Sequence, residues 1–217
     1  MSAAAEAQRD YLAAVLSGSR RRALGAVERA VLAGLDLRTI YLDVLQPTLR
    51  EIGRLWQLNE ITVADEHLAT AITQMVMARL YSDFAPSAAP GGPTLIGACA
   101  ETERHDIGLR MVCDLVEVEG WDAVYLGNTV PLEGLVDIVR QRRPHVVALS
   151  ASIAPHLPQL RAAIAAVRQL ADARWQPLML VGGRAFLDKR DLARAVGADL
   201  AAENAAEAVS LLGERFQ

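Results

Sequence analysis

The sequence predicts a fold of α + α/β class, in which an N-terminal four-helix bundle precedes an open parallel sheet of five strands. Apolar residues recur at helical spacing through residues 1–84. Residues 85–93 contain three Pro and two Gly, which favours a linker. From residue 94 onward, short apolar runs alternate with amphipathic segments, as in strands joined by crossover helices. We therefore expect a helical domain at 1–84 and an α/β domain at 94–217.

The helical domain divides at small, turn-forming residues. Ser17-Gly18-Ser19 and Gly34 separate the first three helical patterns. The third pattern covers residues 37–55 and contains Pro47, whose ring and missing N–H predict a kink or a break. A fourth helix is expected over residues 62–81. Short links between four helices favour a small bundle.

The α/β domain should form a Rossmann-like sheet wound by right-handed crossovers. The expected strands cover residues 94–99, 122–126, 146–150, 178–181 and 199–202. The expected helices cover about 106–119, 132–141, 157–172, 188–195 and 205–213. Ligands of such sheets bind beyond the carboxyl ends of the strands. His105, Asn128, Ser150 and Gly182 all fall at predicted strand ends, which predicts a site at this edge.

Composition narrows the classes of function. The net charge of −4 argues against a protein that binds the nucleic-acid backbone directly. Cys99 and Cys113 lie in apolar patterns and are expected as buried free thiols, which fits a reducing cytoplasm. We see no basic leader segment and no apolar run near the roughly 18 residues that a membrane span needs. We therefore expect a cytoplasmic protein with no membrane association.

The segment from Glu103 to Gly108 carries the most chemical information. It follows the apolar run 94–99, so it should lie at the carboxyl edge of the sheet. A His in such a loop can ligate a bound metal while a nearby carboxylate holds its other ring nitrogen. A Gly in the same loop lets a bulky group approach the backbone.

Three motifs together resemble the signature of the cobalamin-binding domains found in methionine synthase, corrinoid proteins and cobalamin photoreceptors. They are Glu103-x-His105-x-x-Gly108, Ser150-Ala151-Ser152 and Gly182-Gly183, against a family pattern of Asp-x-His-x-x-Gly, Ser-x-Leu and Gly-Gly. Glu103 stands where the family has Asp, and Ser152 stands where it has Leu. The resemblance covers essentially the whole chain, because the helical half looks like the bundle that caps the corrin.

The resemblance implies a cofactor, cobalamin, in its adenosylcobalamin or hydroxocobalamin form. It makes His105 the lower axial ligand of cobalt and Glu103 the partner of its imidazole. The implied cofactor-binding residues of the α/β domain are Glu103, His105, Asp106, Ile107, Gly108, Ser150, Ser152, Gly182 and Gly183. The serine and glycine motifs would receive the displaced nucleotide tail.

The helical half carries a further resemblance. Trp56, followed by nine residues and then Glu66-His67, is similar to the upper-face motif of the CarH/LitR light sensors and the AerR/PpaA antirepressors. This implies that Trp56 covers the upper axial group and that Glu66 and His67 contact it. Gln57 stands where some photoreceptors have a second His, so ligation of cobalt by two histidines through that position is not expected.

These observations predict a non-enzymatic regulator that responds to light or to cobalamin and acts through a partner protein such as a transcriptional repressor. No MerR-type DNA-binding domain precedes the bundle, which favours the antirepressor class. The alternatives are a corrinoid methyl carrier that serves a methyltransferase, and a cobalamin-storage module. Trp56 could instead fill the bundle core, and His145 and His156 are interpreted as structural or exposed. The sequence leaves the upper ligand and the oligomeric state open.

Overall fold

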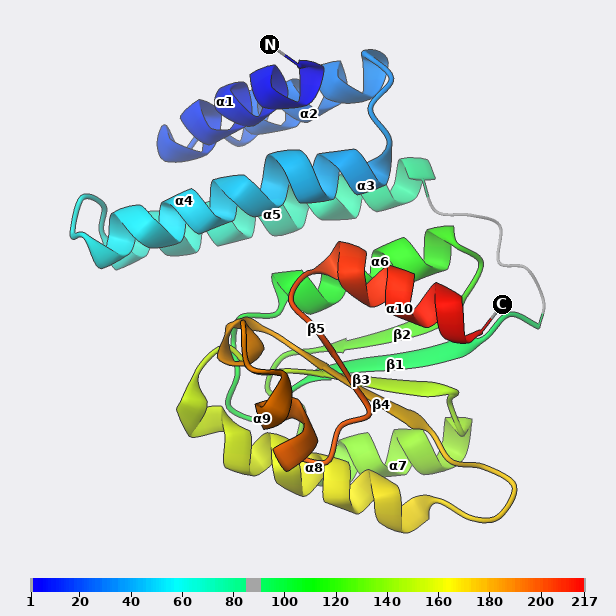
Figure 1. The fold of residues 1–217 in the computed structure, drawn as a ribbon. Coiled ribbons are helices and arrows are strands. Elements are labelled where there is room, and N and C mark those ends of the chain that lie inside the picture. Colours follow the sequence, from blue (N-terminus) through cyan, green and yellow to red (C-terminus); the bar gives the residue numbers. More distant parts are fainter. Residues whose placement is uncertain (1, 85–90, 217) are drawn as a thin grey trace. The chain divides into compact units, whose positions relative to one another are not determined.

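The computed structural model describes residues 2–84 and 91–216 and separates the chain into two compact units, Met1–Ala85 and Pro86–Gln217 (Figure 1). The first unit is helical and the second is α/β, so the predicted fold class is confirmed. Most of the expected linker, residues 85–90, lies outside the described residues. Within the described ranges, no helix combines the length and the apolar character that crossing a bilayer requires.

The helical unit consists of α1 (Ala3–Leu16), α2 (Arg20–Leu32), α3 (Leu37–Thr39), α4 (Gln46–Gln57) and α5 (Val63–Phe84). Side-chain caps fix where helices begin. Ser19 accepts a hydrogen bond from the amide of Arg22, and Asp36 accepts one from the amide of Thr39. In the core, the Tyr11 hydroxyl donates to Thr73 over 3.1 Å and so joins α1 to α5.

Pro47 changes the helical register instead of breaking the helix. Residues Ile40–Leu45 form a π-helical segment between α3 and α4, and the backbone stays in the right-handed helical region through Gln46. The amide of Gln46 donates to the carbonyl of Tyr41, five residues back. A wider turn directly before proline accommodates a residue that cannot donate its own hydrogen bond. The expected third helix therefore continues from Leu37 to Gln57 with an irregular middle.

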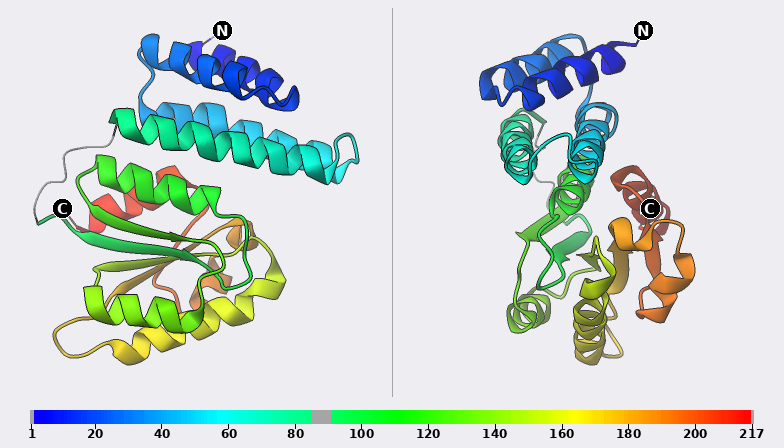
Figure 2. Two further views of the ribbon diagram at one scale, coloured as in Figure 1. Left: turned by 180° about the vertical axis from the view of Figure 1, so that it is seen from behind. Right: turned by 90° about the vertical axis from the view of Figure 1, so that its left-hand side faces the viewer.

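The α/β unit alternates strands with helices. Its strands are β1 (Thr94–Cys99), β2 (Asp122–Gly127), β3 (Val146–Ser150), β4 (Leu178–Gly182) and β5 (Leu200–Ala202). Its helices are α6 (Ile107–Val118), α7 (Leu132–Arg142), α8 (Leu157–Leu170), α9 (Arg190–Ala195) and α10 (Ala205–Arg215). All strands run parallel in the order β2-β1-β3-β4-β5. Helices α6 and α10 cover one face, and α7 and α8 cover the other (Figure 2).

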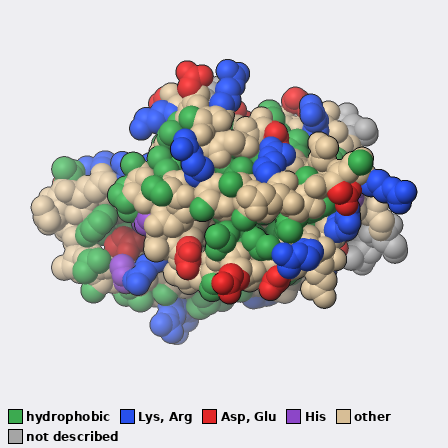
Figure 3. All heavy atoms as spheres, turned by 90° about the horizontal axis from the view of Figure 1, so that it is seen from below, with side chains coloured by type: hydrophobic (Ala, Val, Ile, Leu, Met, Phe, Trp, Pro, Cys, Tyr) green, Lys and Arg blue, Asp and Glu red, His purple; other side chains and the backbone are tan. Residues whose placement is uncertain are grey.

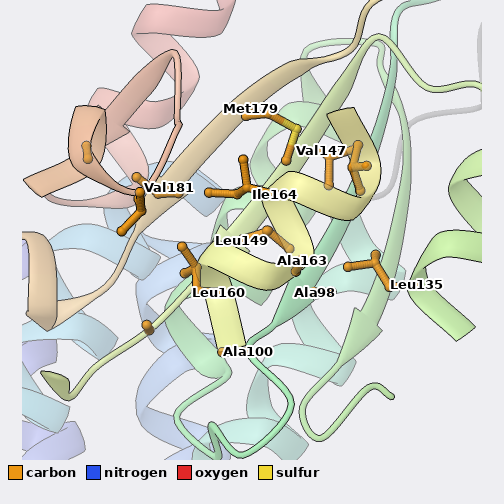
Figure 4. Packing of buried hydrophobic residues seen from close by; sticks show 14 of the residues in the cluster. Ala98, Ala100, Leu135, Val147, Leu149, Leu160, Ala163, Ile164, Met179 and Val181 are labelled. Atoms are coloured by element: carbon orange, nitrogen blue, oxygen red, sulfur yellow. The ribbon is translucent and has the colours of Figure 1, made fainter. Parts of the chain in front are cut away.

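The main core of this unit lies between the sheet and the α7–α8 layer. Leu160, Ala163 and Ile164 of α8 face the central strands, as the close view shows (Figure 4). Strand β3 is buried along its whole length because both faces of the sheet are covered. Cys99 and Cys113 are buried and free, as expected.

The strand order reverses at one point, which is where ligands usually bind in parallel α/β sheets. The chain leaves β1 toward β2 on one side and reaches β3 on the other, so the topology reverses between β1 and β3. The register sets Cys99 beside Ser150 and Ser150 beside Gly182 at the carboxyl ends of their strands. The loops that follow β1 and β3 therefore meet at this switch point.

Candidate functional site

Glu103 organises the loop between β1 and α6. Its side chain is fully buried. Its Oε1 atom accepts hydrogen bonds from the backbone amides of Arg104 (2.9 Å) and His105 (2.8 Å). The same oxygen lies 2.5 Å from Nδ1 of the His105 ring. Glutamate in place of aspartate therefore still reaches the imidazole, and the ring itself is 66% exposed.

The second oxygen of Glu103 holds the loop after β3. Oε2 accepts from the backbone amide of Ser152 (2.5 Å) and lies 3.0 Å from Nδ1 of His156. One carboxylate thus joins the two loops of the switch point. Burial alone raises the pKa of Glu103, but the hydrogen bonds from His105, Ser152 and His156 outweigh it and hold this pKa well below its usual range.

The ionised state of Glu103 determines the tautomer of His105. A carboxylate can only accept hydrogen bonds, so Nδ1 of His105 must carry the proton. In the neutral ring, the lone pair that can bind a metal is then on Nε2. A carboxylate that orients the imidazole in this way also raises its basicity as a ligand.

His156 is a site residue whose role the sequence reasoning missed. Its side chain is only 13% exposed and contacts the buried Glu103. The residue belongs to the 3-10 turn Ala154–His156, directly before α8. The sequence signal that could have drawn attention to it is its place shortly after a predicted strand end.

The three residues after His105 differ in their exposure to solvent. Asp106 and Ile107 are 7% and 9% exposed, so their side chains point into the protein. Gly108 is exposed, and a Cβ atom built there meets no heavy atom within 4 Å. The first turn of α6 therefore leaves open space at Gly108, three residues after the exposed His105, and a bulky ligand can approach the backbone there.

The serine and glycine motifs lie at the ends of β3 and β4. Ser150 is 7% exposed and pairs with Gly182, while Ser152 contributes its backbone amide to Glu103. Gly183 has φ of +97°, and a Cβ atom there would lie 2.4 Å from the carbonyl oxygen of Ala151. The fold itself therefore requires glycine at position 183, whether or not a ligand uses the space.

Replacing Gly183 by alanine is expected to destabilise the ligand-free protein by roughly 2–5 kcal/mol, through backbone strain and a clash with the Ala151 carbonyl. Urea unfolding followed by circular dichroism measures this difference. Gly134→Ala is the control, because that helical position has nothing within 4 Å and alanine there should leave stability unchanged or higher. Equal stability of Gly183→Ala and the natural chain would contradict the close approach.

The residues of the helical unit lie at one end of the α4–α5 hairpin. Trp56 is in the last turn of α4, and Glu66 and His67 are in the first turns of α5, so their spacing spans the connecting turn. The indole is 44% exposed and does not fill the bundle core. Nδ1 of His67 lies 2.6 Å from Glu66, and Thr70 donates to the other Glu66 oxygen over 3.1 Å.

The start of α5 is fixed by a reciprocal cap. The amide of Asp65 donates to the Thr62 hydroxyl oxygen, and the amide of Thr62 donates to the Asp65 carboxylate. The hydrogen bonds from Thr62 lower the pKa of Asp65. This cap fixes where α5 begins, shortly before the Glu66–His67 pair.

Comparison with known proteins gives consistent matches. A family model described as B12 binding domain covers residues 93–210, and a second model of the same description covers residues 7–81. The HTH-type transcriptional repressor CarH of Myxococcus xanthus is 35% identical over 67% of this chain and 48% of its own length. The repressor CarA of the same organism is 34% identical over 54% of this chain. The chain spans only 38% of CarA, so it covers less than half of both repressors.

Corrinoid proteins match over a longer stretch at lower identity. Dimethylamine corrinoid protein 1 of Methanosarcina acetivorans is 27% identical over 94% of this chain and 95% of its own length. The solved structure of the monomethylamine corrinoid protein of Methanosarcina barkeri has a TM-score of 0.83 and covers 97% of this chain and 98% of that chain at 22% identity. That likeness shows a shared fold.

The site fits a metal that brings most of its own ligands. In the part of the chain that the structure describes, no group of three or more His, Cys, Asp or Glu could hold a metal ion. A corrin would supply most of the ligands of its cobalt, so one protein imidazole would be sufficient to hold the metal. The exposed His105 ring held by Glu103, with open space over Gly108, meets this requirement. With a family model covering more than half of its residues, the chain belongs to the B12-binding domain family and binds cobalamin.

Proposed function

We propose that this chain is a cobalamin-binding regulator that responds to light or to cobalamin supply and passes its signal to a partner protein. The observation that carries the proposal is the exposed indole of Trp56, which lies at the same end of the α4–α5 hairpin as the Glu66–His67 pair. A structural tryptophan would be expected in the bundle core, whereas this one is available to a ligand. The identities with two transcriptional repressors support the same conclusion.

In this proposal each group of residues has one task. His105 takes the lower axial position on cobalt, and Glu103 fixes the tautomer and direction of its ring. Bound cobalamin supplies a cobalt whose upper axial group can be exchanged or, when it is an alkyl group such as adenosyl, released by light. Ser150, Ser152, Gly182 and Gly183 receive the nucleotide tail, with Asp106, Ile107 and Gly108 forming the adjoining loop. Trp56, Glu66 and His67 contact the upper axial group.

The signal would leave through the helical unit. A ligand shifts a conformational equilibrium only by the difference in its contacts with the two states. Trp56 and His67 would make different contacts with and without an upper group, and this difference would favour different arrangements of the α4–α5 hairpin. We expect the receiver to be a protein, because a net charge of −4 argues against direct binding to the nucleic-acid backbone. On the α7–α8 face, acidic and basic side chains are interspersed and form no basic patch (Figure 3).

The second candidate function is a corrinoid methyl carrier. The observation in its favour is the end-to-end match with dimethylamine corrinoid protein 1, which covers 94% of this chain. A carrier also needs a protein partner, in that case a methyltransferase. The two candidates share the loop His and differ in the task of Trp56.

The deciding experiment follows the holoprotein, loaded with adenosylcobalamin in darkness, before and after green light. For a regulator, we expect a new absorbance spectrum together with changed hydrogen exchange in α4 and α5. A carrier would instead show its spectral change with a methyl donor, a methyltransferase and reductant, and no light-dependent change in exchange. Hydrogen exchange in the ligand-free protein provides the comparison for a response to cobalamin supply. Binding with neither response, and with the same exchange in α4 and α5 with and without cobalamin, would indicate storage and would contradict the proposal.

Trp56→Ala is expected to reduce the preference for a bulky upper group while leaving overall cobalamin affinity within roughly tenfold, because the indole contacts one ligand and not the corrin anchor. Titrations with adenosyl- and hydroxocobalamin measure that ratio. Leu58→Ala is the matched control, since Leu58 is 55% exposed and lies two residues further along the chain. An unchanged ratio and an unchanged light response in Trp56→Ala would remove the indole from the site.

A further inference from the structure

The ligand loop contains a second buried carboxylate, that of Asp106. It occupies the N-cap position of α6, where an aspartate side chain normally accepts from an amide of the first turn. Here the side chain makes no cap hydrogen bond. It is 7% exposed and accepts a hydrogen bond from Nδ2 of Asn128 over 2.9 Å. This hydrogen bond joins the ligand loop to the segment after β2, and a place for Asp106 in the cofactor loop does not explain it.

The partner side chain is aimed by an irregularity at the end of β2. Gly97 of β1 pairs with Tyr125, but the next residue, Ala98, pairs with Gly127, so β2 bulges at this point. The bulge contains Gly127, whose φ is +82°. Glycine adopts this conformation readily because it has no Cβ. Bulges often occur next to functional sites, where they redirect a side chain. This one turns Asn128 toward the ligand loop.

Thr129 then fixes the orientation of the Asn128 amide. Its φ of +51° is unusual for a β-branched residue, and such conformations persist only when the surroundings impose them. The Thr129 hydroxyl donates to Oδ1 of Asn128 over 3.2 Å. With its oxygen engaged there, the amide presents its N–H groups to Asp106.

Tyr125 supplies a second donor from the same strand. Its hydroxyl donates to Asp106, and burial together with that carboxylate raises the pKa of the phenol far above its usual range. The phenol therefore stays protonated and continues to donate. Asp106 is held by two side chains of the β2 end, from the side of β1 opposite to β3.

We propose that Asn128 is a positioning residue for His105, acting through Asp106. Strand β1 lies between β2 and β3. Glu103 ties the loop after β1 to the β3 side, and Asp106 ties it to the β2 side through Asn128. The ring of His105 lies between these two anchors in the sequence, so it is held before cobalamin arrives. A ligand that is already ordered loses less conformational entropy on binding.

This inference rests on the proposed role of His105 as the cobalt ligand, and a charge swap tests it. Asn128→Asp sets a second carboxylate against Asp106, so we expect the loop to loosen. The double variant Asp106→Asn with Asn128→Asp restores one amide and one carboxylate with their places exchanged. Recovery in the double variant would show that the pair itself matters. Asn204→Asp, which follows β5 at the other edge of the sheet and keeps its helix cap, is the matched control.

Two measurements read the position of the ring itself. In the ligand-free protein, the Nδ1 proton of His105 should give a slowly exchanging ¹⁵N–¹H signal, which His105→Ala identifies by its loss. In holoprotein made with ¹⁵N-histidine and reduced to cobalt(II), nitrogen splitting in the EPR spectrum reports the fraction with a protein imidazole on cobalt. A merely stabilising contact would lower the melting temperature and leave both signals intact.

We expect Asn128→Asp to lose the slow proton signal, to bind cobalamin roughly tenfold more weakly and to show a smaller imidazole-ligated fraction. The double variant should recover all three, and Asn204→Asp should match the natural chain. Both signals intact in Asn128→Asp would overturn the inference alone. Absence of imidazole splitting in the natural holoprotein would overturn the role of His105 and this inference with it. If Asn128→Asp does not fold, Asn128→Ala, which adds no charge, is assessed by the same two signals.

Discussion

Replacing His105 by alanine is expected to abolish the spectral change that accompanies transfer of cobalamin from solution to the protein. That change arises when a protein imidazole becomes the lower ligand, and the structure offers His105 with its lone pair on Nε2. Affinity should fall by roughly tenfold or more, at least the loss expected for an outer-shell partner. Visible titration with hydroxocobalamin measures both quantities.

Two controls separate loss of the ligand from damage to the loop. Arg104→Ala changes the exposed neighbour, whose backbone amide still donates to Glu103, so its spectrum should match that of the natural chain. Millimolar imidazole added to His105→Ala should restore the spectrum, because it can occupy the vacated volume. A His105→Ala protein with the natural spectrum and affinity would show that another group ligates cobalt.

The strands were accessible to sequence reasoning because a parallel sheet covered on both faces leaves continuous apolar runs. Those runs predict every observed strand to within one residue, from β1 at Thr94–Cys99 to β5 at Leu200–Ala202. The helical half is also predicted correctly in outline. At Pro47 the expectation is a kink or a break, and the structure has no break but a π-helical segment directly before the proline.

The site was accessible only in part. Glu103 and His105 are two residues apart, so their contact can be inferred from local spacing. The contacts of Glu103 with His156 and of Asp106 with Asn128 span 53 and 22 residues. They depend on the strand order and on a bulge in β2, and a pattern of apolar residues specifies neither. Gly183 shows a different limit of the sequence. The motif predicts that this glycine leaves room for a ligand, whereas the structure shows that a side chain there would also clash with the Ala151 carbonyl.

Replacing Glu103 by glutamine is expected to weaken both the fold and the site. The carboxylate accepts hydrogen bonds at both oxygens, whereas glutamine has one acceptor and one donor group. One set of donors, either in its own loop or at Ser152 and His156, would then face an N–H group. We expect a loss of roughly 1–3 kcal/mol in the free energy of unfolding, as for a buried donor left without an acceptor. Cobalamin affinity should fall roughly 10–100-fold, because the His105 ring loses its orienting partner.

The pH dependence of this loss distinguishes an ionised Glu103 from a neutral one. The pKa of Glu103 is lowered in the folded protein, so its ionisation contributes stability above the unfolded value of 4.5, and this contribution is lost as pH falls toward the folded pKa. The difference in unfolding free energy between the natural chain and Glu103→Gln should therefore be largest near neutral pH and shrink below about pH 4.5. Glu101→Gln, an exposed change two residues earlier in the same loop, should show neither the loss nor the pH dependence. A difference that stays constant from pH 7 to pH 3 would mean that Glu103 does not hold the two loops as a carboxylate.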